Sequence, residues 1–196
     1  MRGRLARAML PLLLVILAPS THAQDGDSAE YIIKAGFIYN FANLVQWPSI
    51  SFSEANSPIV IAILGEDRFG TTLDRMLQGK KSDGHPFVIK RFRSVSELVK
   101  SVANPRECQI LYVGSSALPQ SSEAIRVVKG LPILTIGEIP GFATSGGIIN
   151  LVLEDNRIRF EVNVQAAKDA DLNISSRLLA LARIVQSTGA DGRKAE

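Results

Sequence analysis

The sequence predicts an α/β domain of three layers, in which helices cover both faces of a mainly parallel central sheet. Continuous apolar, β-branched runs are typical of strands that are covered on both faces, and three such runs lie at 59–64, 109–113 and 131–136. Stretches with helical spacing alternate with these runs, as in βαβ units. After Gly141 the rhythm changes, and two β-rich runs joined by 154–156 predict a C-terminal antiparallel hairpin.

The positive charge of the chain is concentrated at its start. The 196 residues carry a formal net charge of +3, and the first 23 contain Arg2, Arg4 and Arg7 but no acid. The remainder has 19 basic and 19 acidic residues, so it gives no electrostatic reason to expect binding to nucleic acid or anionic lipid. A hydrophobic fraction of 46% with 21% charged residues excludes a disordered chain, and the length suits one domain.

Residues 1–23 have the pattern of a secretory signal peptide. Basic residues come first, an apolar run follows over 8–18, and Thr21 and Ala23 place small side chains where signal peptidase requires them. The run is shorter than the roughly 20 apolar residues that span a bilayer. We therefore expect export with cleavage between Ala23 and Gln24 and no later membrane insertion; an uncleaved amphipathic anchor is the alternative. One domain over 24–188 and a polar tail over 189–196 are then expected.

The first helix of the domain is expected over residues 28–46. Ser28 is a suitable N-cap, and Trp47 followed by Pro48 ends the pattern. Apolar side chains occupy most of the circumference of this segment, which requires burial on two sides. The helix is therefore expected either deep in the core or covered by a partner.

The remaining elements follow in order along the chain. Strands are expected at 59–64, 86–92, 109–113 and 131–136, helices at 69–77, 95–102 and 121–129, and the hairpin strands at 147–153 and 157–162. Two helices close the domain, over 164–170 with Asn163 as N-cap and over 176–185 with Ser175 as N-cap. The last helix is predicted from apolar residues at i, i+3, i+4 and i+7 that begin at Leu178.

Motifs that carry chemistry are weak in this chain. The loop 65–72 has the glycine spacing of a phosphate loop, but Thr71 stands where that loop needs lysine. We interpret the loop as a strand-to-helix turn. Ser116 lacks the second glycine of a nucleophile elbow, and His85 is the only histidine after residue 23, so an exported hydrolase is a minor alternative. One histidine cannot hold zinc.

Cys108 is the only cysteine, which excludes an internal disulfide and a cysteine-based zinc site. It adjoins a predicted core strand, so we expect it to be buried rather than paired with another chain.

Three segments of the chain resemble the motifs of the YfiR-like exported proteins. They are residues 34–41 with 46–48, residues 146–150 with 159–163, and residues 172–182, and the resemblance extends over roughly 28–187. It implies a non-catalytic periplasmic regulator that binds and represses the periplasmic sensor domain of an inner-membrane diguanylate cyclase, which lowers cyclic di-GMP and disfavours biofilm. It also implies a homodimer without catalytic residues, cofactor or metal. Cys108 matches one family cysteine but has no partner in this chain.

The matched motifs supply the candidate partner-binding residues. These are Trp47 as an apolar anchor, Glu161 and Asn163 as polar contacts, and Asn173, Ile174 and Arg177 as completion of the same patch. Each has a structural alternative. Asn163 and Asn173 can act as caps, Ile174 can belong to the core, and Glu161 with Arg177 can form a surface ion pair of little energetic value.

A second hypothesis from a different class is a small-ligand receptor that feeds another membrane signalling protein, such as a sensor kinase. Parallel sheets bind ligands beyond the carboxyl ends of their strands. In this sequence that edge holds Gly65-Glu66, Gly114-Ser115-Ser116 and Gly137-Glu138.

Overall fold

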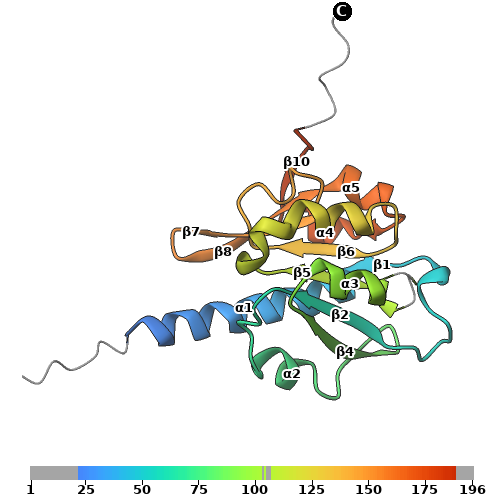
Figure 1. Ribbon diagram of the computed structural model, residues 1–196, viewed down its shortest axis with the longest axis horizontal. Coiled ribbons are helices and arrows are strands. Elements are labelled where there is room, and N and C mark those ends of the chain that lie inside the picture. Colours follow the sequence, from blue (N-terminus) through green and yellow to red (C-terminus); the bar gives the residue numbers. More distant parts are fainter. Residues whose placement is uncertain (1–21, 103, 105–106, 189–196) are drawn as a thin grey trace, which may run out of the picture.

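The computed structural model describes residues 22–102, 104 and 107–188 and is built around an eight-stranded mixed sheet (Figure 1). Its strands are β2 (Ile59–Leu64), β3 (Lys81–Ser82), β4 (His85–Phe92), β5 (Ile110–Val113), β6 (Leu134–Gly137), β7 (Ile149–Glu154), β8 (Arg157–Asn163) and β10 (Arg183–Val185). They lie in the order β10-β8-β7-β6-β5-β2-β4-β3. The run from β7 to β4 is parallel, whereas β8 is antiparallel to β7. The predicted α/β class is confirmed.

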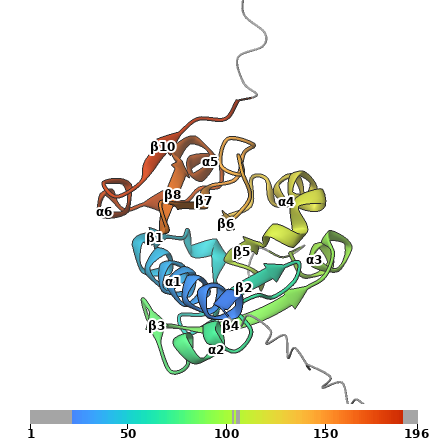
Figure 2. The same cartoon turned by 90° about the vertical axis from the view of Figure 1, so that its left-hand side faces the viewer.

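Helices cover both faces of this sheet (Figure 2). They are α1 (His22–Leu44), α2 (Thr72–Leu77), α3 (Val95–Val102), α4 (Ser121–Val128), α5 (Val164–Asp169) and α6 (Ser176–Leu179). The larger core lies between the sheet and α1 with α2, and the smaller one lies between the sheet and α3 with α4. The three predicted layers are therefore present. No helix in the described part of the chain is long and apolar enough to cross a membrane.

The first helix differs from its predicted bounds at both ends. It begins at His22, so Ser28 lies inside it and the predicted N-cap is wrong. A serine acts as an N-cap only where the residues before it are not helical. The predicted cleavage site therefore falls in the first turn of α1, while residues 1–21 lie outside the described residues. The helix ends at Leu44 because Val45 and Gln46 form the short strand β1 (Val45–Gln46).

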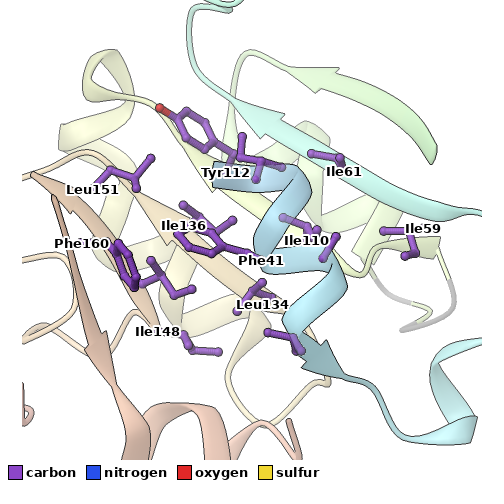
Figure 3. Packing of buried hydrophobic residues seen from close by; sticks show 14 of the residues in the cluster. Phe41, Ile59, Ile61, Ile110, Tyr112, Leu134, Ile136, Ile148, Leu151 and Phe160 are labelled. Carbon is purple, nitrogen blue, oxygen red and sulfur yellow. The ribbon is translucent and has the colours of Figure 1, made fainter. Parts of the chain in front are cut away.

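One face of α1 packs on the sheet and another faces solvent. Phe41 is fully buried, and its ring centroid lies 5.2 Å from that of Phe160 on β8. Figure 3 shows Phe41 reaching from the helix toward Ile136 and Phe160. Ile32 and Ile33 are 48% and 50% exposed. The prediction of a helix deep in the core is therefore wrong, and cover by a partner stays a prediction.

The C-terminal segment shows the largest departure from the sequence prediction. The helix expected over 176–185 stops at Leu179, and Arg183–Val185 instead form β10, parallel to β8. Leu181, which the helical pattern placed on an apolar face, is 76% exposed. The apolar spacing fits a helix, but the backbone of these residues instead pairs with the otherwise open edge of β8.

Local signals placed most other boundaries correctly. Asp155 and Asn156 have φ values of 49° and 60°, as a two-residue hairpin turn requires. The side-chain oxygen of Asn163 accepts a hydrogen bond from the amide of Ala166 at 3.0 Å, so its role as the cap of α5 is confirmed. Ser175 caps α6 in the same way. The other predicted elements lie within three residues of their observed bounds.

Two glycines make room for one aromatic ring. The ring of Phe142 lies so close to Gly137 and Gly147 that a Cβ on either glycine would come within 2.3 or 2.2 Å of a ring carbon. Phe142 is buried in the smaller core. The second glycine of the Gly146-Gly147 motif is therefore required by packing.

Candidate functional site

The pairing of β1 with β9 (Asn173–Ile174) joins two motifs that are far apart in the sequence. Val45 lies opposite Ile174 and Gln46 lies opposite Asn173 in an antiparallel register. The amide group of Asn173 donates a hydrogen bond to Oε1 of Gln46 at 3.2 Å. A shallow hollow lies beside this pair, and Arg177 of α6 contributes to its lining.

Gln46, Asn173 and Arg177 are among the exposed polar residues of this hollow, together with Asn43 and Ser176. We call the surface formed by Gln46, Asn173 and Arg177 the β1–β9 platform. Ile174 lies beneath it and is 8% exposed. It therefore belongs to the core, which was the structural alternative to a role in partner binding.

Trp47 follows the platform directly but is held by the fold. Its indole Nε1 donates a hydrogen bond to the main-chain oxygen of Gln109 at 3.2 Å, and its ring packs against the larger core. The side chain of Gln109 is fully buried; its amide donates to the oxygen of Ser51 and its Oε1 accepts from the amide of Val60. Trp47 is therefore a half-buried, oriented side chain rather than a protruding one.

Glu161 and Asn163 lie on the other face of the sheet from α1. Side chains alternate along β8, and Phe160 and Val162 point into the α1 core. Asn163 is fully buried, and its amide donates to the oxygen of Ala143 and to Oγ of Ser187, both at 2.8 Å. These contacts give Asn163 a structural role.

Glu161 binds Arg183 rather than Arg177. Its Oε1 lies 2.9 Å from Nη2 of Arg183, and its Oε2 accepts from the amide of Asn150 at 3.1 Å. Glu154 also contacts Arg183, at 2.7 Å. Of the six predicted residues, only Asn173 and Arg177 thus lie on the platform, while Trp47 and Ile174 pack beneath or beside it and Glu161 and Asn163 lie on the opposite face. Sequence reasoning missed the pairing of Arg183, because the residue was assigned to a helix.

The most connected charged group of the fold is a carboxylate at the carboxyl edge of the sheet. Glu138 follows β6, and it accepts hydrogen bonds from the hydroxyls of Tyr31 at 2.9 Å and Tyr112 at 2.7 Å and from the amide of Ser115 at 2.9 Å. It also forms an ion pair with Lys34 of α1. We call these five residues the Glu138 cluster.

The charge states of the cluster follow from these contacts. Burial opposes ionisation of Glu138, but Lys34, the amide of Ser115 and the Tyr112 hydroxyl together lower its pKa. Burial, reinforced by the negative charge of Glu138, raises the pKa of both Tyr31 and Tyr112 well above the usual value. The cluster is thus an ionised carboxylate held by an ammonium and two neutral phenols. It fills part of the edge where a small ligand was expected.

Ser116 has a structural contact in this edge. Its Oγ accepts a hydrogen bond from the amide of Glu66 at 2.7 Å, and it lies 2.6 Å from where a Cβ on Gly65 would be. His85 begins β4 and therefore lies at the opposite, amino-terminal edge of the parallel strands. The two residues of the hydrolase hypothesis are thus kept apart by the length of a strand.

The loop after β2 is a strand-to-helix turn, as expected. Asp67 accepts from the amide of Phe69 at 2.9 Å and forms an ion pair with Arg91 at 2.6 Å. Cys108 is 1% exposed, and burial raises the pKa of its thiol to about 12. Its predicted burial is confirmed.

A family model described as YfiR/HmsC-like matches residues 31–183. The match begins inside the Glu138 cluster and ends at Arg183, so it includes the β1–β9 platform and the Glu161–Arg183 pair. The chain belongs to the YfiR/HmsC-like family. Members of the YfiR/HmsC-like family are periplasmic, non-catalytic regulators that act with membrane signalling partners. No curated protein gives a significant match to the chain.

Proposed function

We propose that this protein binds the periplasmic sensor domain of an inner-membrane diguanylate cyclase and represses it, which lowers cyclic di-GMP. The observation that supports the proposal is the pairing of β1 with β9. It brings together two segments of the family match that are more than 120 positions apart in the sequence. Together they form one exposed surface, the β1–β9 platform. The proposal assigns direct contacts with the partner to Asn173 and Arg177.

The remaining predicted residues have supporting or separate roles in this proposal. Trp47 and Ile174 hold the platform on the core. Asn163 is buried and acts through the start of α5. Glu161 is half-buried beside Arg183, and we propose that this pair forms a second polar contact on the opposite face.

Repression requires a difference in affinity between two states of the cyclase. A ligand that binds both states equally shifts nothing, however tightly it binds. Each factor of ten in the ratio of the two affinities corresponds to about 1.4 kcal/mol. Hundredfold repression therefore needs about 2.7 kcal/mol of preference for the inactive state, which a few placed polar contacts on an apolar base can supply.

The test is capture of the cyclase's isolated periplasmic domain by the purified protein. Arg177→Glu reverses the charge of the platform at an exposed position, so it should weaken capture at least tenfold without changing the melting temperature. Arg126→Glu on α4 is the matched control, because Arg126 is also exposed and forms a single ion pair among the described residues, with Glu123 at 3.5 Å.

Two results would count against this assignment. Equal capture by wild type and Arg177→Glu removes the platform from the interface. Absence of capture by wild type removes the cyclase as the partner. The homodimer is part of the same proposal, and sedimentation equilibrium measures it directly.

A further inference from the structure

A cavity of about 390 Å³ lies at the amino-terminal edge of the sheet, away from the Glu138 cluster. It opens between the end of α1, β1, the segment that follows Trp47, and the β3–β4 hairpin. Its lining includes Trp47, Phe52, His85, Asn43, Gln46 and Asp83. The volume falls in the range of small-molecule sites.

Three ring side chains, those of Trp47, Phe52 and His85, belong to the lining of the cavity. The ring of Phe52 stacks on the imidazole of His85, with centroids 3.9 Å apart and planes at 17°. The hydrogen bond from Trp47 to Gln109 fixes the indole and uses its only N–H group. These walls therefore offer ring faces and edges, which attract planar groups and cations.

The polar groups of the cavity include both acceptors and donors, the amide groups of Asn43 and Gln46 among them. Nδ1 of His85 lies 2.6 Å from the oxygen of Ser57; because a carbonyl only accepts, Nδ1 carries a proton and donates to it. The amide nitrogen of Asn43 donates to the oxygen of Tyr39 at 2.7 Å, which leaves its Oδ1 as an acceptor.

Asp83 is the only Asp, Glu, Lys or Arg among the lining residues. It occupies the turn between β3 and β4 with a φ of 48° and is exposed. Lys80 of the same hairpin does not line the cavity, since its ammonium lies over the ring of Tyr39 at 4.5 Å. The formal charge of the lining is thus negative.

We propose that this cavity binds a small aromatic amine in its cationic form. The ammonium group donates to the carboxylate of Asp83 and to the neighbouring acceptors, and the ring lies among Trp47, Phe52 and His85. The inference does not need the cyclase, although the cavity adjoins the β1–β9 platform through Gln46, which lines both.

Trp47 makes the proposal directly testable, because it is the only tryptophan of the chain. Phenethylammonium is titrated into the full chain while the indole emission is followed. We expect a saturable change in emission with a Kd of about 1 mM or lower, as suits a ligand of this size. Phenylacetate, which has a similar ring but a negative charge, should give no saturable change.

Variants identify the site. Asp83→Asn should raise the Kd at least fivefold and keep the fold, because asparagine tolerates a positive φ. Asp155→Asn is the matched control, since Asp155 is also an exposed turn residue with a φ of 49°, and it should leave the Kd unchanged. Absence of a saturable change with wild type, an unchanged Kd in Asp83→Asn, or equal binding of phenylacetate would each overturn the proposal.

Discussion

The ammonium group of Lys34 on α1 forms an ion pair with the carboxylate of Glu138 after β6, and both side chains are almost completely buried. The pair ties the middle of the first helix to the carboxyl edge of the sheet. Glu30 supports it from the preceding turn of α1, with its Oε1 2.5 Å from Nζ of Lys34.

Replacing Glu138 by glutamine should destabilise the fold. The substitution keeps the shape of the side chain but leaves Lys34 with Glu30 alone, and breaking a buried pair typically costs about 3–5 kcal/mol. Because Glu30 remains, we expect a loss of about 2–3 kcal/mol in denaturant unfolding at neutral pH. Glu123→Gln removes an exposed pair instead and should change stability by less than about 0.5 kcal/mol. Equal effects of the two substitutions would contradict the assignment.

The contribution of Glu138 should disappear in acid. Its pKa is lowered in the folded state, whereas glutamate in an unfolded chain titrates near about 4.3. The stabilisation is therefore present above that value and is lost as the pH falls through the lower folded-state pKa. Urea unfolding of wild type and Glu138→Gln at several pH values measures this contribution. The difference between their free energies of unfolding should be constant near neutrality and shrink below about pH 4. A difference that stays constant down to pH 3 would refute it.

Gly147→Ala should destabilise the protein through the ring of Phe142. The new Cβ would lie 2.2 Å from a ring carbon, and such overpacking typically costs about 1–3 kcal/mol. Gly36→Ala is the control, because nothing lies within 4 Å of a Cβ at this helical position. That change should stabilise by about 0.5–1 kcal/mol, as alanine is the better helix former. Thermal unfolding of both variants decides the matter, and a neutral Gly147→Ala would show that the ring can move.

Cys108 should be inert in the native protein. Burial and a raised pKa of about 12 keep the thiol protonated, and the thiolate is the reactive form. A thiol reagent at pH 8 should label the unfolded chain fully and the native chain at the rate of global unfolding. Fast native labelling, or a disulfide-linked dimer on a non-reducing gel, would show that Cys108 is accessible.

Local and periodic signals predicted most of the fold, and long-range pairing explains the failures. The apolar runs of β2 and β5 and the cap at Asn163 can be read from neighbouring residues. The strand β10 cannot, because its apolar spacing also fits a helix and only the edge of β8, about 20 positions earlier, decides between them. Pairing with β9 likewise ends α1 before its predicted stop.

The candidate sites show the same division. Glu138 was placed correctly at the carboxyl edge, since it follows a buried strand. Its partners could not be predicted, because Tyr31 lies 107 positions away along the chain. The platform motifs were identified separately, but only the β1–β9 register places Gln46 beside Asn173. The prediction placed Glu161 and Asn163 in one patch with Asn173 and Arg177. The alternation of side chains along β8 instead puts Glu161 and Asn163 on the face opposite to Phe160 and Val162.

The position of α1 also constrains the order in which the protein can fold. The helix comes first in the chain, yet residues that contact it or the adjoining β1 are synthesised more than 100 residues later. Glu138 contacts Tyr31 of α1, and Ile174 pairs with Val45 of β1. A chain that is synthesised N-terminus first therefore presents the apolar side of α1 before any sheet exists to receive it. Such long-range closure slows folding. Folding of this helix onto the sheet is therefore completed only after the last quarter of the domain has been synthesised.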